Sequence, residues 1–102
     1  MKVRLIVLRA ASIMLVLAMP VQAADVFKGQ RLYAQECERC HGSDGSGVMA
    51  GGVDFSLGDG LRVSNKRLHD HIDRGKGGCP SFFGILESEE ILDVVAYLRT
   101  LY

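Results

Sequence analysis

The sequence predicts an all-α fold of three to four helices. Near the carboxyl end, apolar residues recur at helical spacing: Ile91, Val94, Val95, Leu98 and Leu101. No segment shows apolar–polar alternation long enough for a strand. A third observation is the run Cys37-Glu38-Arg39-Cys40-His41, which can hold a large apolar cofactor for the helices to surround.

The first 23 residues are interpreted as a secretory signal peptide. Lys2, Arg4 and Arg9 give a basic start, an uncharged run follows over 10–19, and small residues precede the predicted cleavage after Ala23. The alternative is an uncleaved membrane anchor, for which the run is about half the ~20 residues a spanning helix needs. Cleavage leaves residues 24–102 as one domain in the periplasm.

The predicted mature chain is small and slightly acidic. The leader holds three of the twelve basic residues and no acidic one. Residues 24–102 therefore contain nine basic and twelve acidic residues, a net charge of −3. This balance disfavours nucleic-acid binding, which needs clustered basic residues. A domain of this size has a limited core and commonly needs a covalent or metal staple.

The first helix is expected from about Val26 to Cys37, with Asp25 as its N-cap. Its apolar contacts are Phe27, Leu32 and Tyr33. Gly29 inside this helix costs about 1 kcal/mol relative to alanine, so we expect another backbone to approach it closely. The following glycine-rich segment, 42–60, is expected to be an ordered loop at the cofactor edge rather than a flexible linker.

Two further helices follow. One is expected over 64–74, opened by Ser64 or Asn65 and ended by Gly75. A loop over 75–84 leads to the last helix, opened by Glu87 or Ser88, whose first turn carries acidic residues at the positive end of the helix dipole.

The run Cys37 to His41 predicts covalent haem attachment. Each thiol can add to one vinyl group of a haem, and the adjacent His41 can bind the iron from the proximal side. The alternative is a Cys37–Cys40 disulfide with Cys79 as a free thiol, which leaves His41 unexplained. The surrounding segments also lack the βαβ pattern of a thioredoxin-like fold.

With these residues placed, residues 24–102 resemble the small class I c-type cytochromes over nearly their whole length. Residues 29–42 look like the family's first helix and haem motif, 43–47 like its following loop, and 94–99 like its last helix. The resemblance implies the small cytochrome c fold and one haem c bound through Cys37 and Cys40, with His41 as axial ligand. It also implies a close crossing of the first and last helices, with Tyr33 and Tyr97 packed there.

One position departs from the family pattern. A methionine before a proline usually supplies the second axial ligand, and here the corresponding residues are Cys79-Pro80. Cys79 is therefore the leading candidate for the distal ligand, and a small buried residue that does not bind iron is the alternative. The other candidates are Met49, His71, His69 and an open sixth site.

The function that follows from the resemblance is electron transfer in the periplasm by a protein that is not an enzyme. No acid–base pair or nucleophile–base constellation stands out beside the haem motif. The expected partners are redox proteins (a reductase, oxidase or dehydrogenase), with no nucleic acid and no membrane span in the mature form. The alternative is a haem-based redox or gas sensor, or a subunit of a sulfur-oxidising (thiosulfate) enzyme with a His/Cys-ligated haem.

Overall fold

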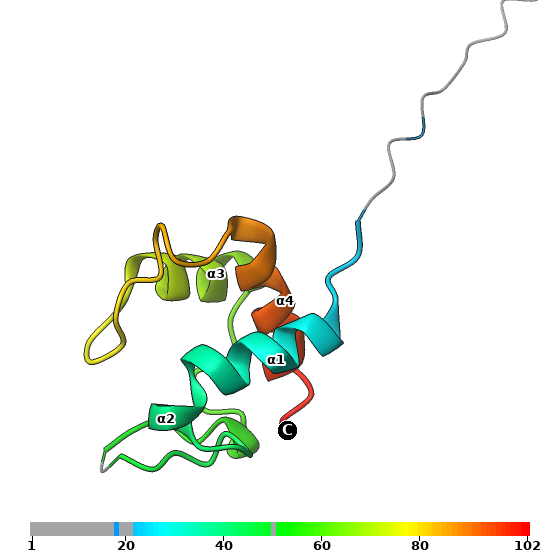
Figure 1. Cartoon of the computed structure of the whole chain (residues 1–102). Helices are drawn as coiled ribbons and strands as arrows, with labels where there is room; N and C mark the ends of the chain where they lie inside the picture. Colours follow the sequence, from blue (N-terminus) through cyan, green and yellow to red (C-terminus); the bar gives the residue numbers. More distant parts are fainter. Residues whose placement is uncertain (1–17, 19–21, 50) are drawn as a thin grey trace, which may run out of the picture.

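The computed structural model describes residues 18, 22–49 and 51–102, so most of the predicted signal peptide lies outside the described residues. These residues form four α-helices and one 3₁₀ turn, with no strand among them (Figure 1). The elements are α1 (Val26–Glu36), α2 (Glu38–His41), η1 (Phe55–Leu57), α3 (Asn65–Arg74) and α4 (Ser88–Leu98). The all-α prediction is confirmed.

The predicted helix starts are confirmed by their caps. The Asp25 carboxylate accepts a hydrogen bond from a backbone N–H in the first turn of α1, at 3.0 Å. The Ser64 hydroxyl does the same for α3 at 3.2 Å. At α4, Glu87 and Glu90 form a capping box, in which each side chain accepts from the backbone N–H of the other.

The crossing of α1 and α4 organises the fold. A Cβ built on Gly29 would lie 1.9 Å from the backbone carbonyl oxygen of Asp93, so the two backbones meet where only glycine fits. One turn further along α1, the rings of Tyr33 and Tyr97 lie 5.2 Å apart at an interplanar angle of 60°. Both contacts were predicted, and both are confirmed.

The hydrophobic core lies between α1, α3 and α4. Its buried members are Tyr33, Leu61, Leu68, Phe82, Leu86, Ile91, Val94, Val95 and Leu98. Four of the five apolar residues that predicted the last helix are in this list. The fifth, Leu101, lies beyond the end of α4, and its side chain packs beside Gly45 in the loop after α2.

Two local features differ from the predicted elements. The first helix ends at Glu36, and Cys37 separates it from the short helix α2, which was not predicted. Four residues are too few for a periodic pattern, so the sequence carries no signal for α2.

At the C-terminal end of α4, the Arg99 guanidinium donates hydrogen bonds to the carbonyl oxygens of Leu61 and Val63. These bonds join the end of α4 to the segment before α3.

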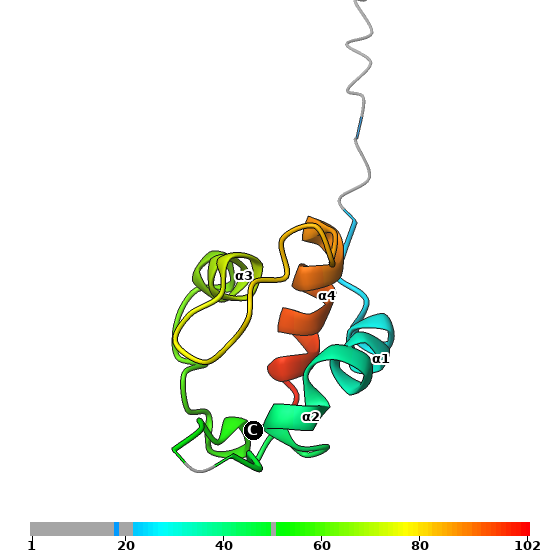
Figure 2. The ribbon, with the colours of Figure 1, turned by 60° about the vertical axis from the view of Figure 1, so that its left-hand side comes forward.

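Figures 1 and 2 show how three groups of segments are arranged. The α1–α4 pair lies on one side, α3 and its following loop lie on another, and α2 lies with the described parts of 42–60 on the third. No helix among the described residues is long and apolar enough to cross a membrane.

Candidate haem site

The two cysteines and the histidine of the predicted motif lie on one turn of backbone. The N–H groups of Cys40 and His41 both donate to the carbonyl oxygen of Cys37, at 3.2 and 3.0 Å. Cys37 is half-buried beside the core, whereas Cys40 is exposed. The motif thus presents two thiols of unequal exposure from one short, hydrogen-bonded segment.

The His41 imidazole is half-buried and stacks on the ring of Phe55, with ring centroids 4.6 Å apart. Burial lowers the pKa of His41, which favours the neutral ring with a free nitrogen lone pair at neutral pH. A metal ligand needs this form. Sequence reasoning missed Phe55, because no local pattern links it to a histidine fourteen positions earlier.

Hydrogen bonds hold the segment after the motif against the motif and against α1. The N–H of Gly47 donates to the carbonyl of His41 at 2.8 Å, and the buried Tyr33 hydroxyl donates to the carbonyl of Gly42 at 2.6 Å. Further along, the N–H of Phe55 donates to the carbonyl of Gly45 at 2.7 Å. These bonds confirm an ordered loop over the described parts of 42–60, and they fix Phe55 beside His41.

Cys79 is held by a tight turn in the loop between α3 and α4. Its N–H donates to the Lys76 carbonyl at 3.0 Å, and its carbonyl accepts from the Lys76 N–H at 3.2 Å. A Cβ on Gly75, whose φ is +78°, would lie 2.8 Å from the Cys79 carbonyl oxygen. The backbone that carries the Cys79 thiol is therefore tightly constrained.

The fold brings Cys79 into the neighbourhood of the motif. Burial raises the pKa of Cys37 to about 12, and negative charge on Cys79 is the next largest cause. Burial also raises the pKa of the Cys79 thiol, followed by the effect of charge on Cys40. Cys37 and Cys79 lie far apart in sequence, yet both pack against the hydrophobic core, while Cys40 is exposed.

These residues suit a haem. Among the described residues, no group of three or more His, Cys, Asp or Glu side chains could hold a bare metal ion. A porphyrin supplies four iron ligands itself, so the protein needs to supply only one or two, for which His41 and Cys79 are the candidates. The 42–60 segment also exposes apolar side chains that a flat apolar ring could cover: Val48, Met49, Val53 and Leu57.

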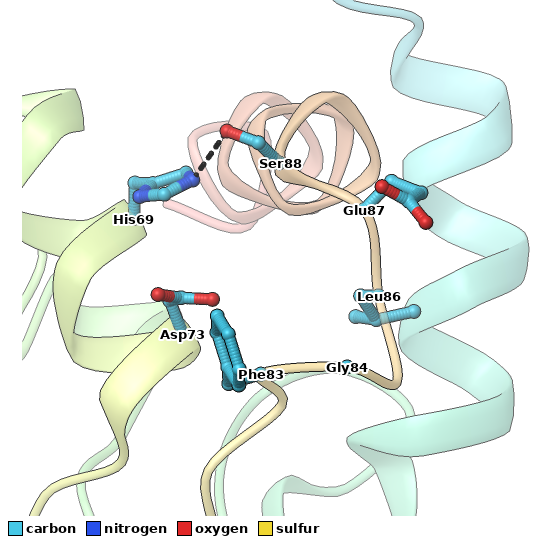
Figure 3. A pocket seen from close by; sticks show the side chains of 7 residues that line it. All are labelled: His69, Asp73, Phe83, Gly84, Leu86, Glu87 and Ser88. Carbon is cyan, nitrogen blue, oxygen red and sulfur yellow. Dashed lines mark hydrogen bonds between the residues drawn. The ribbon is translucent and has the colours of Figure 1, made fainter.

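The competing ligand candidates are placed differently. His69 forms a 2.8 Å hydrogen bond with the Ser88 hydroxyl (Figure 3) and also lies 3.3 Å from an Asp70 oxygen. It lines a cleft of about 440 Å³ between α3 and the start of α4, together with Phe83. His71 is half-buried on α3, and Met49 is 62% exposed.

Four helices around a motif with two thiols and a histidine define a c-type cytochrome. Residues 24–98 match the family model described as "Cytochrome C oxidase, cbb3-type, subunit III". The chain is 31% identical to cytochrome c6 of Thermosynechococcus vestitus, over 96% of this chain and 91% of that protein. The chain therefore belongs to the cytochrome c family, as a small class I c-type cytochrome that carries one covalently bound haem c.

Two further matches bear on the fold and on the chemistry. A solved c-type cytochrome, KustC0563, superposes with a TM-score of 0.64 at 28% identity, over 72% of this chain and 95% of that one. The thiosulfate dehydrogenase of Stutzerimonas stutzeri is 30% identical over 79% of this chain. The chain spans only 29% of that enzyme's length.

Proposed function

We propose that this cytochrome is a periplasmic electron carrier whose haem is attached through Cys37 and Cys40. The observation that carries the attachment is the single hydrogen-bonded turn that presents both thiols and His41 together. In this proposal the Cys37 and Cys40 sulfurs form thioethers, and the His41 imidazole is the proximal iron ligand. Phe55 holds the plane of that imidazole by stacking on it.

Cys79 is the proposed distal ligand. The constrained turn at Lys76–Cys79 and the packing of Cys37 and Cys79 against the same core support this role. A thiolate donates electron density to iron and favours the ferric state, whereas a thioether raises the potential. The proposed site is therefore a low-potential centre.

For electron transfer, the protein needs only to bind the haem and to provide its surroundings. A bound haem supplies an iron that gains and loses one electron. The chain's contribution is to hold the ring with two thioethers, to fix two axial side chains and to limit access of water. The net charge of −3 on residues 24–102 favours docking to a redox protein with a basic surface, through a small and weak interface. Export with cleavage after Ala23 places the carrier in the periplasm.

The haem attachment is tested by peptide mapping of the purified holoprotein. We expect the haem to resist acid–acetone extraction and, after proteolysis, to remain on the peptide that contains Cys37 and Cys40. The Cys40→Ser variant should retain at most one thioether bond. Extraction of the haem from the parent protein would contradict the proposal.

The carrier role is tested by carbon monoxide and by redox cycling. A closed carrier with two axial protein ligands should cycle reversibly by one electron and should bind carbon monoxide slowly or not at all in the ferrous state. Rapid binding would instead indicate an open or labile site and favour the sensor alternative.

A second candidate function is that of a subunit in thiosulfate oxidation. It is favoured by the similarity to a protein named thiosulfate dehydrogenase. Its test is the addition of thiosulfate and an electron acceptor to the ferric protein. Sustained, catalytic reduction of the acceptor would favour the enzyme subunit. Absence of turnover, together with reversible cycling, supports the carrier.

A further inference from the structure

A second cleft, of about 510 Å³, lies where the chain enters α1 and passes α4. One side of it is lined by Ala24, Asp25 and Lys28, together with Gln22 and Ala23, which the proposed cleavage removes. The other side is lined by Glu89, Leu92 and Asp93 of α4. None of its lining residues belongs to the haem motif, and nothing in the proposed electron transfer uses it.

Asp93 is the unusual residue of this cleft. It is a carboxylic acid in the middle of α4 that is only 8% exposed. One carboxylate oxygen, Oδ1, accepts a hydrogen bond from the backbone N–H of Asp25 at 2.7 Å. Within the described part of the chain, no group donates to the other oxygen, and the nearby Lys28 pairs with Glu90 at 3.4 Å. Among the described residues no fully buried side-chain oxygen lacks a partner, so this second Asp93 oxygen is accessible from the cleft that Asp93 lines.

We propose that the cleft binds the chain's own α-ammonium group, which cleavage after Ala23 creates on Ala24. The inference rests on the proposed export. The Ala24 nitrogen belongs to the residue directly before Asp25, whose N–H already contacts Asp93, so it lies within about 6 Å of the same carboxylate. The new ammonium and the Asp25 amide then donate to one buried carboxylate.

The charges around the cleft favour a cation. Asp25 and Lys28 face it from the α1 side, and Asp93 and Glu89 face it from α4, with Glu90 paired to Lys28. Before cleavage the Ala24 nitrogen is a neutral amide that offers only one N–H. Processing therefore adds a charge-assisted contact that ties the first residue of the mature chain to the α1–α4 crossing.

This contact has a definite pH dependence. Pairing with Asp93 raises the pKa of the Ala24 amino group above the ordinary range of about 7.7–8.0. The stabilisation is fully present below that ordinary range and is lost as the pH rises through the raised pKa. The precursor, which lacks the ammonium at this place, has no such loss.

The experiment compares two holoproteins made from protease-cleavable fusions. One begins at Ala24, and the other retains Gln22-Ala23, which displaces the ammonium by about 7 Å of chain. Each is also made as Asp93→Asn, which keeps an acceptor oxygen but removes the charge. In urea at pH 6.5 we expect the Ala24 form to have about a tenfold larger folding equilibrium constant than the extended form. The ratio should fall towards one at pH 10 and in Asp93→Asn. An unchanged ratio in Asp93→Asn would overturn the proposal.

A second readout does not depend on stability. Competitive acetylation of the Ala24 amino group across pH gives its pKa in the folded parent, and we expect a value above the ordinary range. A value within that range would also overturn the proposal. Intact mass of the protein exported with its own leader separates the two claims. A start other than Ala24 contradicts the predicted cleavage, while the Asp93 site is still decided by the protein made to begin at Ala24.

Discussion

At the scale of single residues, Gly29 permits the crossing of α1 and α4. We expect Gly29→Ala to destabilise the holoprotein by about 3 kcal/mol, because its methyl group would overlap the Asp93 carbonyl and force the helices apart. Urea unfolding followed by circular dichroism measures this loss. The matched control is Gly78→Ala, whose Cβ meets nothing within 4 Å and should change stability by less than about 0.5 kcal/mol. Equal effects of the two substitutions would contradict the close crossing.

The Cys79 side chain sets the redox chemistry in the proposed site. We expect Cys79→Met to raise the midpoint potential by more than about 0.1 V, because a neutral thioether replaces an anionic thiolate within the ~0.8 V range that axial ligands span. Spectroelectrochemical titration measures the change. Cys79→Ser serves as the control that removes the sulfur altogether. A Cys79→Met protein with the parent's potential and spectrum would show that Cys79 is not a ligand.

Single residues also show what sequence reasoning can and cannot reach. Asp25, Ser64 and Glu87 were predictable as helix starts because capping is a local interaction. The close backbone approach at Gly29 was predictable because glycine destabilises a helix interior, so its presence there indicates a close contact that only glycine permits. Phe55 was not, since its contact with His41 depends on the path of the loop between them and not on any repeated pattern.

At the scale of the elements, Tyr33 links α1 to the segment that follows the haem motif. We expect Tyr33→Phe to cost about 1–2 kcal/mol, because it removes the buried hydrogen bond to the Gly42 carbonyl but keeps the ring. Thermal unfolding of the holoprotein measures this cost. Tyr97→Phe is the control: Tyr97 shares the ring contact, and its hydroxyl donates no hydrogen bond within the described residues. A loss in Tyr97→Phe as large as that in Tyr33→Phe would mean that the Gly42 bond is not the source of the cost.

The elements were predictable to different degrees. The helices α1, α3 and α4 combine a cap signal with apolar spacing, and they form close to their predicted starts. The short α2 and the end of α4 at Leu98 were not anticipated, because four residues carry no periodicity and Leu101 continues the spacing beyond the helix. Tertiary packing beside Gly45 explains why Leu101 is still apolar.

At the scale of the whole molecule, the small core between α1, α3 and α4 is expected to depend on the haem. We expect the double variant Cys37→Ser with Cys40→Ser to lose covalent haem and much of its cooperative unfolding. A core of this size supplies only about 3–5 kcal/mol without a staple. Circular dichroism and urea unfolding measure the effect. Cys79→Ser, which leaves both attachment thiols in place, should keep the haem and the helical content. Full parental stability in the double variant would contradict a structural role for the haem.

The proposed role of Cys79 depends on the whole molecule. Its position in sequence before Pro80 indicated a ligand only through the family resemblance, since no spacing rule relates it to Cys37 or Cys40. The structure adds that the turn at Lys76–Cys79 reverses the chain after α3 and that Cys79 packs against the same core as Cys37.

The central claim is an iron held between His41 and Cys79 in a haem attached through Cys37 and Cys40. The most direct test is the combined optical and electron-paramagnetic-resonance spectrum of the ferric holoprotein. We expect a low-spin iron with the signature of thiolate ligation, which disappears in Cys79→Ser. A high-spin spectrum would mean that no strong sixth ligand is present, and a methionine charge-transfer band would assign the position to Met49; either result would contradict the account.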